Sequence, residues 1–216
     1  MQKTDRTLFF KALLSQEPRL ETELFYTNAY TLLVAVVLSA QATDAGVNKA
    51  TASLFKRVSS PQEMVALGEE GLRQAIRTIG LYPTKARHVI ALSRLLLEKH
   101  QGAVPSEREA LESLPGVGRK TANVVLNVFF NQPTIPVDTH VFRVANHTGL
   151  APGKTPLEVE KKLLQYVPKA FLSRAHHMLI FHGRYTCKAR KPLCAQCPVS
   201  TFCAYFKHEK PKEKLA

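Results

Sequence analysis

Apolar residues recur at helical spacing along most of this chain, and the two-residue alternation of a half-buried strand does not. Residues 30–39, YTLLVAVVLS, are apolar on nearly every side and run on into SAQATD without a turn signal. A buried strand could have this composition, but the length and continuity of the run predict a central buried helix. Asp44 can cap the next helix, which is expected to reach about Arg57. Its apolar face would consist of Val47, Ala50, Leu54 and Phe55.

Glycines punctuate the middle of the chain. A short helix from about Glu70 is expected to end at Gly80, since glycine suits a left-handed C-terminal cap. Residues 81–83, Leu-Tyr-Pro, are then expected to form a loop. Residues 84–100 repeat apolar positions at helical spacing and predict a long helix that Gly102 stops.

Helix-capping signals recur in the second half. Capping boxes at residues 106–109 and 155–158 each predict a helix start, and Asp138 is expected to open another helix. A helix over about residues 173–181 is expected to end at Gly183. The pattern as a whole predicts an all-α protein of roughly ten helices, and no linker separates domains cleanly.

Charge narrows the choice of partner. The 216 residues are 45% hydrophobic, which excludes global disorder and allows one large domain or two small ones. Lys and Arg number 30 against 17 Asp and Glu, giving a net charge of +13. This excess favours a polyanion, with nucleic acid first, although a basic enzyme with another substrate would share it.

No membrane or secretory segment is expected. The longest apolar run, residues 32–38, is far below the ~18 residues of a membrane span. The N-terminus, MQKTDRTLFFKALL, lacks a long apolar core and a small-residue cleavage site. An intracellular protein keeps its thiols reduced, so its cysteines require an explanation other than disulfides.

Two glycines mark a candidate anion site. The sequence Leu114-Pro-Gly-Val-Gly118 joins two predicted helices as a hairpin, with Gly116, Val117 and Gly118 at the turn and Arg119 directly after it. Glycines let the backbone approach a ligand closely, and the following helix start offers free N–H groups to a phosphate. An ordinary turn would look similar, but the adjacent basic residues favour DNA binding.

Lys120 and Asp138 are candidate catalytic residues. Lys120 follows the hairpin, and a neutral lysine amine can attack an electrophilic carbon. Most lysines are only solvated surface charges, however. Asp138 suits a helix N-cap, and a carboxylate held by backbone N–H groups can also stabilise developing positive charge.

All four cysteines lie near the C-terminus in the pattern C-x6-C-x2-C-x5-C. They are Cys187, Cys194, Cys197 and Cys203. Thiolates at this spacing can hold one metal centre, either a tetrahedral zinc ion or an iron–sulfur cluster. The histidines at 176, 177 and 182 could also suggest a metal site, but no carboxylate pattern such as HExxH accompanies them.

The chain resembles the endonuclease III family in four features, which occur in the family's order through nearly its whole length. They are the segments SAQATD, LPGVGRKTA and VDTH and the spacing of the cysteines. The resemblance implies a bifunctional DNA glycosylase and abasic lyase that removes oxidised pyrimidines. Lys120 would be the Schiff-base nucleophile, Asp138 the essential carboxylate, and the four cysteines the ligands of one four-iron, four-sulfur cluster. It also implies two helical domains flanking a DNA-binding cleft. A six-helix domain would span residues 22–132, with its hairpin motif at about 106–130, and a cluster domain residues 1–21 plus 133–216.

Further DNA contacts are expected, two of them from the same resemblance. Gln41 and Leu81 match positions that fill the space left by a flipped nucleotide, and His140 can contact phosphate near Asp138. The interval between the first two cysteines carries Lys188, Arg190 and Lys191. Cluster ligands at both ends would make it a rigid basic loop, and we expect it to contact phosphates.

Three rival functions remain open. Adenine- and thymine-mismatch glycosylases resemble this chain but differ at the position of Lys120. A non-catalytic DNA-binding or redox module could also use the hairpin and the cluster. The preferred hypothesis is a monomeric repair enzyme of the cytoplasm and nucleoid that acts on double-stranded DNA with damaged bases or abasic sites.

Overall fold

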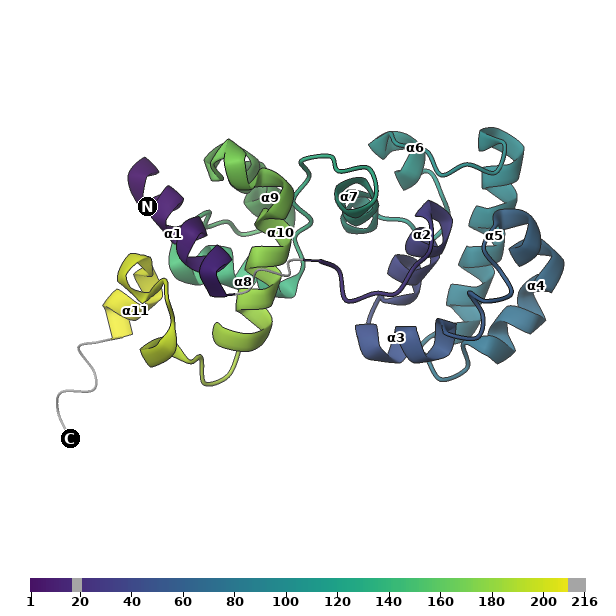
Figure 1. The fold of residues 1–216 in the computed structure, drawn as a ribbon, viewed down its shortest axis with the longest axis horizontal. Coiled ribbons are helices and arrows are strands. Elements are labelled where there is room, and N and C mark those ends of the chain that lie inside the picture. Colours follow the sequence, from purple (N-terminus) through teal and green to yellow (C-terminus); the bar gives the residue numbers. More distant parts are fainter. Residues whose placement is uncertain (17–20, 210–216) are drawn as a thin grey trace. The chain divides into compact units, whose positions relative to one another are not determined.

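A computed structural model describes residues 1–16 and 21–209, and every regular element within those ranges is helical. The predicted all-α class is therefore confirmed. The chain divides into two compact units (Figure 1). The hairpin unit is Thr22–Gln132, and the cysteine unit is Met1–Glu21 together with Pro133–Ala216. No helix in the described part of the chain combines the length and apolar character needed to cross a bilayer.

Helix α2 (Ala29–Leu38) forms the centre of the hairpin unit, as the apolar run predicted. Every residue from 30 to 38 is buried. Asn28 caps the helix by accepting the N–H of Thr31, whose hydroxyl in turn accepts the Asn28 N–H. Fully burying each leucine contributes roughly 2 kcal/mol, so this helix is a main source of the unit's stability. Its neighbours are α3 (Asp44–Thr51), α5 (Tyr82–His100) and α7 (Arg119–Val128).

The predicted cap of α3 was wrong by one residue. The hydroxyl of Thr43 accepts the N–H of Gly46, and Asp44 lies inside the first turn. The helix also ends at Thr51 rather than near Arg57, and turns follow it. The apolar positions after the helix end still pack: Leu54 is buried and Phe55 lies against the same core.

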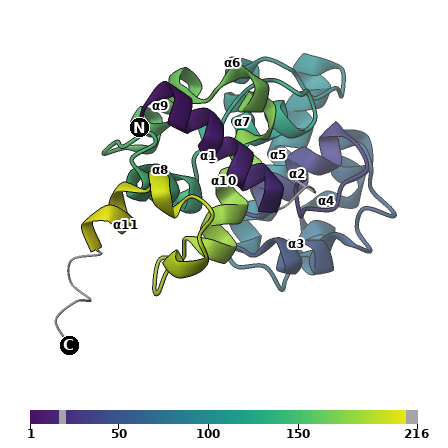
Figure 2. The same ribbon diagram turned by 60° about the vertical axis from the view of Figure 1, so that its left-hand side comes forward.

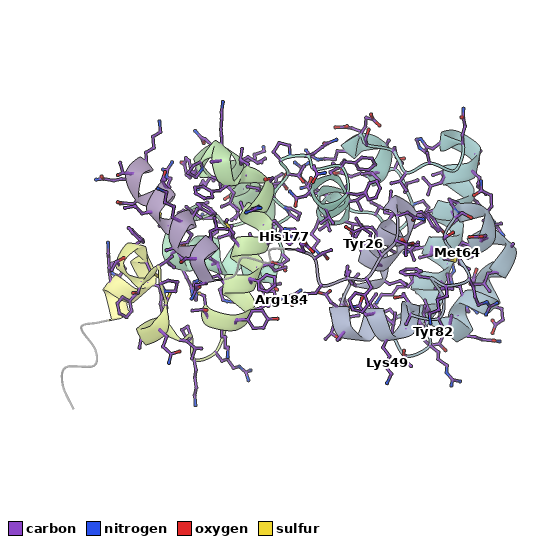
Figure 3. All side chains as sticks on the ribbon, viewed as in Figure 1. Tyr26, Lys49, Met64, Tyr82, His177 and Arg184 are labelled. Atoms are coloured by element: carbon purple, nitrogen blue, oxygen red, sulfur yellow. The ribbon has the colours of Figure 1, made fainter. Side chains whose placement is uncertain are left out.

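Helix α4 (Pro61–Ala75) begins nine residues before the predicted start. Ser60 and Glu63 form a capping box ahead of Pro61, and Gly68 kinks the helix with a φ of 75°. The sequence analysis identified only the part after this kink. Met64, on the first part, is fully buried (Figure 3).

The left-handed residue after α4 is Leu81, not Gly80. Leu81 is the N-cap of α5, with φ 61° and ψ 24°. Residues 81–83 therefore are not a free loop, because α5 starts at Tyr82 and takes Pro83 into its first turn. Helices α4 and α5 pack side by side along much of their length (Figure 1).

The hairpin helices are α6 (Arg108–Glu112) and α7. The predicted capping box at residues 106–109 does not form. Glu107 is the N-cap and makes no side-chain capping bond, while the Ser106 hydroxyl donates to the Glu107 carboxylate. The two helices nevertheless contact each other, and Leu111 and Leu114 join the core of the hairpin unit.

The cysteine unit packs N-terminal and C-terminal segments around one core (Figure 2). Its longer helices are α1 (Lys3–Gln16), α8 (Thr139–Thr148), α9 (Pro156–Tyr166) and α10 (Leu172–Phe181). Thr155 is the N-cap of α9 and its hydroxyl accepts the Glu158 N–H, as predicted. The predicted capping box is only half formed, because the Glu158 carboxylate accepts the N–H of Lys154 instead of that of Thr155. Helix α10 continues into a π-helical turn, η2 (His182–Thr186), so Gly183 does not end it. Shorter elements complete the unit: η1 (Lys169–Phe171), η3 (Cys194–Gln196), η4 (Ser200–Phe202) and α11 (Ala204–Glu209).

Candidate active site and metal centre

The turn between α6 and α7 is shaped by its first glycine. Gly116 has a φ of 80°, and a Cβ added there would lie 2.9 Å from the Cβ of His88. Both the backbone conformation and the close approach exclude larger residues. Val117 is buried, and its N–H is bonded to the carbonyl of Leu114. An anion at this turn must therefore bind to other N–H groups than that of Val117.

Those groups lie at the start of α7. Gly118 is the N-cap and supplies no side chain, so the first N–H groups of the helix have no side-chain cap. The first turn of an α-helix leaves its N–H groups without intrahelical acceptors, and its positive dipole end attracts anions. The Arg119 guanidinium lies 4.0 Å from the Glu112 carboxylate. The second residue of α7 is Lys120, which is exposed to solvent.

Asp138 opens α8, as the sequence predicted. One carboxylate oxygen accepts the N–H of Val141 at 2.8 Å. The side chain is only partly buried, whereas Ile135 and Val137 before it are buried in the core of the cysteine unit. The carboxylate is thus held by the helix start and remains accessible from one side. Lys120 belongs to the hairpin unit and Asp138 to the cysteine unit.

The first turn of α8 packs tightly against the π turn that follows α10. A Cβ on Gly183 would come within 2.8 Å of the Cβ of His140. Arg143 donates to the carbonyls of Gly183 at 2.7 Å and Cys187 at 2.9 Å. Its guanidinium also lies 3.3 Å from Nδ1 of His140, one helical turn earlier in α8. His140 is half-buried.

Three residues predicted to contact DNA share an unusual backbone conformation. Gln41, Leu81 and Lys191 have φ values of 54°, 61° and 53°. All three are exposed, and Leu81 leaves 59% of its surface to solvent. Residues other than glycine adopt this left-handed region at a cost. Gln101 and Asn131 also adopt it, and no DNA contact was predicted for them. Lys188 and Arg190, beside Lys191, are exposed as well.

The four cysteines converge on one cavity. All are free thiols, and they line one pocket together with residues of α8, η2 and α11. Within residues 1–16 and 21–209, no group of three His, Cys, Asp or Glu side chains could hold a single metal ion. The ligands of a four-iron cluster lie further apart than those of a single ion, because each thiolate binds a different iron. Four thiols that line one pocket without forming a single-ion site agree with that donor arrangement.

Burial disfavours the thiolate form of two of the cysteines. Burial raises the pKa of Cys187 to about 11, with Arg143 lowering it and the other three thiols raising it further. Burial also raises the pKa of Cys197. Metal binding must therefore displace protons, and the gain from iron–thiolate bonds has to exceed that cost.

Two histidines face the ligand sulfurs. Nδ1 of His147 lies 3.7 Å from Sγ of Cys187, and Nε2 of His182 lies 3.7 Å from Sγ of Cys197. Burial lowers the pKa of His182 to about 4 and lowers that of His147 as well, with Arg143 adding to the latter shift. Neutral imidazoles can donate N–H groups to ligand thiolates. The sequence analysis missed both contacts, because neither histidine adjoins a cysteine in the chain.

Comparisons with known proteins agree with this geometry. Residues 34–169 match the HhH-GPD superfamily of base excision DNA repair proteins, and residues 187–203 match the iron–sulfur binding domain of endonuclease III. The chain is 55% identical over 197 residues to endonuclease III of Rickettsia conorii, covering 91% of this chain and 94% of that protein. The chain belongs to the endonuclease III family. Endonuclease III of Escherichia coli is 54% identical over 205 residues, which cover 95% of this chain and 97% of its relative.

Solved structures of endonuclease III confirm the family fold. A trapped endonuclease III–DNA covalent intermediate superposes with a TM-score of 0.90 at 45% identity, covering 97% of this chain and 99% of that one. A non-covalent endonuclease III–DNA complex gives 0.91 at 44% identity, covering 98% and 100%. A thermostable thymine-DNA glycosylase, with a TM-score of 0.85 at 23% identity, shares the fold.

Family membership settles two alternatives that the residues left open. The cysteine segment holds the four-iron, four-sulfur cluster of the endonuclease III family, not a zinc ion. The chain is an enzyme of base excision repair, a bifunctional DNA glycosylase and abasic-site lyase, rather than a non-catalytic module. In both of the solved endonuclease III structures above, the protein is in complex with DNA.

Proposed function

We propose that this enzyme removes oxidised pyrimidines from duplex DNA with Lys120 as the nucleophile and Asp138 as the assisting carboxylate. The observation that carries the proposal is the place of Lys120. It lies in the first turn of α7, directly after the glycine turn, exposed to solvent and within the segment that matches the repair superfamily. A DNA phosphate on the uncapped N–H groups of α7 would bring the neighbouring sugar to the lysine amine.

The chemistry has two stages. The damaged base leaves the helical stack, and the neutral Lys120 amine attacks the anomeric carbon of its sugar. The new C–N bond replaces the glycosidic bond, and the base departs with the bonding electrons and a proton. Ring opening then gives a Schiff base, which acidifies the neighbouring sugar proton. Loss of that proton expels the 3′ phosphate by β-elimination and cuts the strand.

Asp138 supports this sequence through its negative charge. Its carboxylate is held by the Val141 N–H and therefore needs no reorganisation as positive charge develops on the sugar. A carboxylate can also act as a general base, and the attack requires the neutral form of the Lys120 amine.

The remaining DNA contacts fall into two classes. We assign the exposed Gln41 and Leu81 to the space that the extruded nucleotide leaves, since planar and apolar groups can stack there. The second class would bind phosphates. It comprises the α7 N–H groups, Arg119, the half-buried His140 and the basic residues after Cys187. The basic residues are Lys188, Arg190 and Lys191. Phosphate contacts fix the position of the duplex without reading its sequence.

The cluster has a structural role in this scheme. Four protein ligands leave no open coordination position, so the cysteines would tie the basic loop to the rest of the cysteine unit. We treat the hairpin unit and the cysteine unit as the two domains of the enzyme. Because the proposed substrate is duplex DNA and the relatives are bacterial enzymes, we place its action in the cytoplasm, at the nucleoid.

A panel of duplexes, each with a single lesion, tests the proposed substrate class. We expect excision of thymine glycol, incision at abasic sites, and products with a 5′ phosphate and an unsaturated 3′ aldehyde. Excision of adenine opposite 8-oxoguanine without strand cleavage would instead identify a mismatch glycosylase. The same outcome would overturn the lyase assignment of Lys120.

A further inference from the structure

The segment that leads into Asp138 is buried but belongs to no helix. Residues 134–137 are all buried, although residues 131–138 have no regular structure. Such a segment depends on tertiary hydrogen bonds to fix its backbone, since neither a helix nor a strand provides them. Proline at 136 also has no N–H to donate, so only its carbonyl can anchor it through a hydrogen bond.

A histidine on α10 provides that anchor. Nδ1 of His176 lies 3.0 Å from the carbonyl oxygen of Pro136, forty residues earlier in the chain. His176 is only 4% exposed. A carbonyl oxygen can only accept, so Nδ1 must carry the proton in this hydrogen bond. The ring nitrogen that faces the segment is therefore a fixed donor in either charge state of the imidazole.

The anchored carbonyl is close to the carboxylate along the backbone. Only Val137, itself 8% exposed, separates Pro136 from Asp138. Rotation of the peptide unit after Pro136 would thus change the direction in which the chain enters α8. The N-cap conformation of Asp138, with φ −97° and ψ −173°, depends on that direction.

The other side of Asp138 rests on the continuation of the same helix. Gly183, in the π turn after α10, packs against His140 and accepts a hydrogen bond from Arg143. Helix α10 and its π turn therefore hold the backbone on both sides of the carboxylate. His176 bonds Pro136, two residues before Asp138, and Gly183 contacts His140 and Arg143, which follow it.

We propose that His176 is a positioning residue that aims the Asp138 carboxylate by fixing the Pro136 carbonyl. This inference rests on the proposed role of Asp138 in base excision. His176 makes no contact with the substrate in this scheme. Its contribution is transmitted through Pro136 and Val137, and removal of its donor misplaces the carboxylate without removing it.

A matched pair of substitutions isolates the hydrogen bond. His176→Asn and His176→Leu shorten the side chain to nearly the same shape, but only asparagine keeps an N–H donor near the position of Nδ1. We expect single-turnover excision by His176→Asn to stay within about 3-fold of the parent enzyme. His176→Leu should be slower by about 10- to 100-fold, the range for small misplacement of a catalytic group. Equal rates for the two variants would overturn the proposal.

A double-mutant cycle shows whether His176 acts through Asp138. In an Asp138→Asn background, His176→Leu should have little further effect on excision, because the carboxylate it aims is already lost. A full additional loss would mean that His176 acts elsewhere and would refute the inference. If Asp138→Asn alone left excision unchanged, the proposed role of Asp138 would fail, which is a separate outcome.

The neighbouring histidine provides the control for local packing. The His177 ring lies edge-on to that of His176 at 5.1 Å and is 8% exposed, and Figure 3 shows it on α10. His177→Phe should leave the excision rate within about 2-fold, and the affinity of all variants for a duplex with a tetrahydrofuran site should change little. A loss with His177→Phe equal to that with His176→Leu would attribute the effect to packing and contradict the proposal.

Discussion

The Asp138 carboxylate accepts the backbone N–H of Val141 at 2.8 Å. The same oxygen therefore caps α8 and belongs to the group that we assign to catalysis. The two roles can be separated, because asparagine caps helices about as well as aspartate but carries no charge.

Asp138→Asn should preserve the fold and remove the electrostatic role. We expect the free energy of unfolding to change by less than about 1 kcal/mol, as the cap is kept. Base excision should fall by about 100- to 1,000-fold, the usual loss for a group that stabilises transition-state charge. Thermal unfolding and single-turnover excision measure the two effects, with Asp138→Ala as the variant that loses both. An Asn variant with full activity would exclude an ionised carboxylate from the mechanism.

Leu81→Gly should affect stability and DNA binding in opposite directions. A leucine in the left-handed region costs roughly 1 kcal/mol or more, whereas glycine adopts it freely. Since Leu81 is 59% exposed, little core burial is lost. The extra freedom of glycine in the unfolded chain offsets part of the gain, so we expect up to about 1 kcal/mol of stabilisation.

Comparison with Leu81→Ala separates backbone strain from the side chain. Alanine keeps the strained conformation but removes the apolar group, so both variants should bind a tetrahydrofuran duplex more weakly than the parent enzyme does. Only the glycine variant should melt at a higher temperature. If the two variants bound that duplex normally, Leu81 would have no part in filling the vacated space.

Lys191→Glu should weaken DNA binding and flatten its dependence on salt. Each lysine–phosphate contact releases counterions, so the slope of log K against log salt should fall by about 1 or more. Lys161→Glu, an exposed position on α9, makes the same change in net charge and is the control. The visible absorbance of the cluster should be the same in both variants. Equal salt slopes for both would show that the basic loop makes no specific contact.

The stability of the protein should fall as the pH drops below neutrality. Burial lowers the pKa of His177 below its ordinary value of 6.5, with the charge of Glu21 opposing part of the shift. The unfolded chain therefore binds a proton at a higher pH than the folded chain does. The contribution of neutral His177 to stability is fully present above the pKa of this histidine in the unfolded chain. That contribution is lost as the pH falls towards its pKa in the folded protein.

His177→Phe should remove part of this pH dependence. We expect its free energy of unfolding to decrease less between pH 7.5 and 5.5 than that of the parent, as measured by urea denaturation with cluster absorbance monitored in parallel. A steeper decrease in the variant would contradict the assigned direction of the His177 pKa shift.

Local patterns predicted much of the hairpin unit. Helix α2 followed from an uninterrupted apolar run, and the hairpin followed from glycines at Gly116 and Gly118. Errors arose where two residues could serve the same function: Thr43 caps α3 in place of the adjacent Asp44. Leu81 adopts the left-handed conformation although Gly80 precedes it, and local propensity would favour the glycine at that position.

Contacts between distant parts of the chain were beyond the sequence analysis. His176 and Pro136 are forty residues apart, and nothing in either local sequence signals their hydrogen bond. The same holds for His147 and Cys187. The cysteine spacing did indicate a metal centre, but thiolate chemistry alone allows zinc or iron, and the family match was needed to decide between them.

Borohydride trapping tests the central claim most directly. Reduction of the Schiff base on a duplex with one abasic site should give a covalent protein–DNA adduct whose mass places the link at Lys120. Lys120→Gln should give no adduct, whereas Lys49→Gln, at an exposed lysine of α3 (Figure 3), should trap as well as the parent enzyme. Binding to a tetrahydrofuran duplex verifies that each variant still engages DNA. Normal trapping by Lys120→Gln would contradict the assignment of Lys120 as the nucleophile.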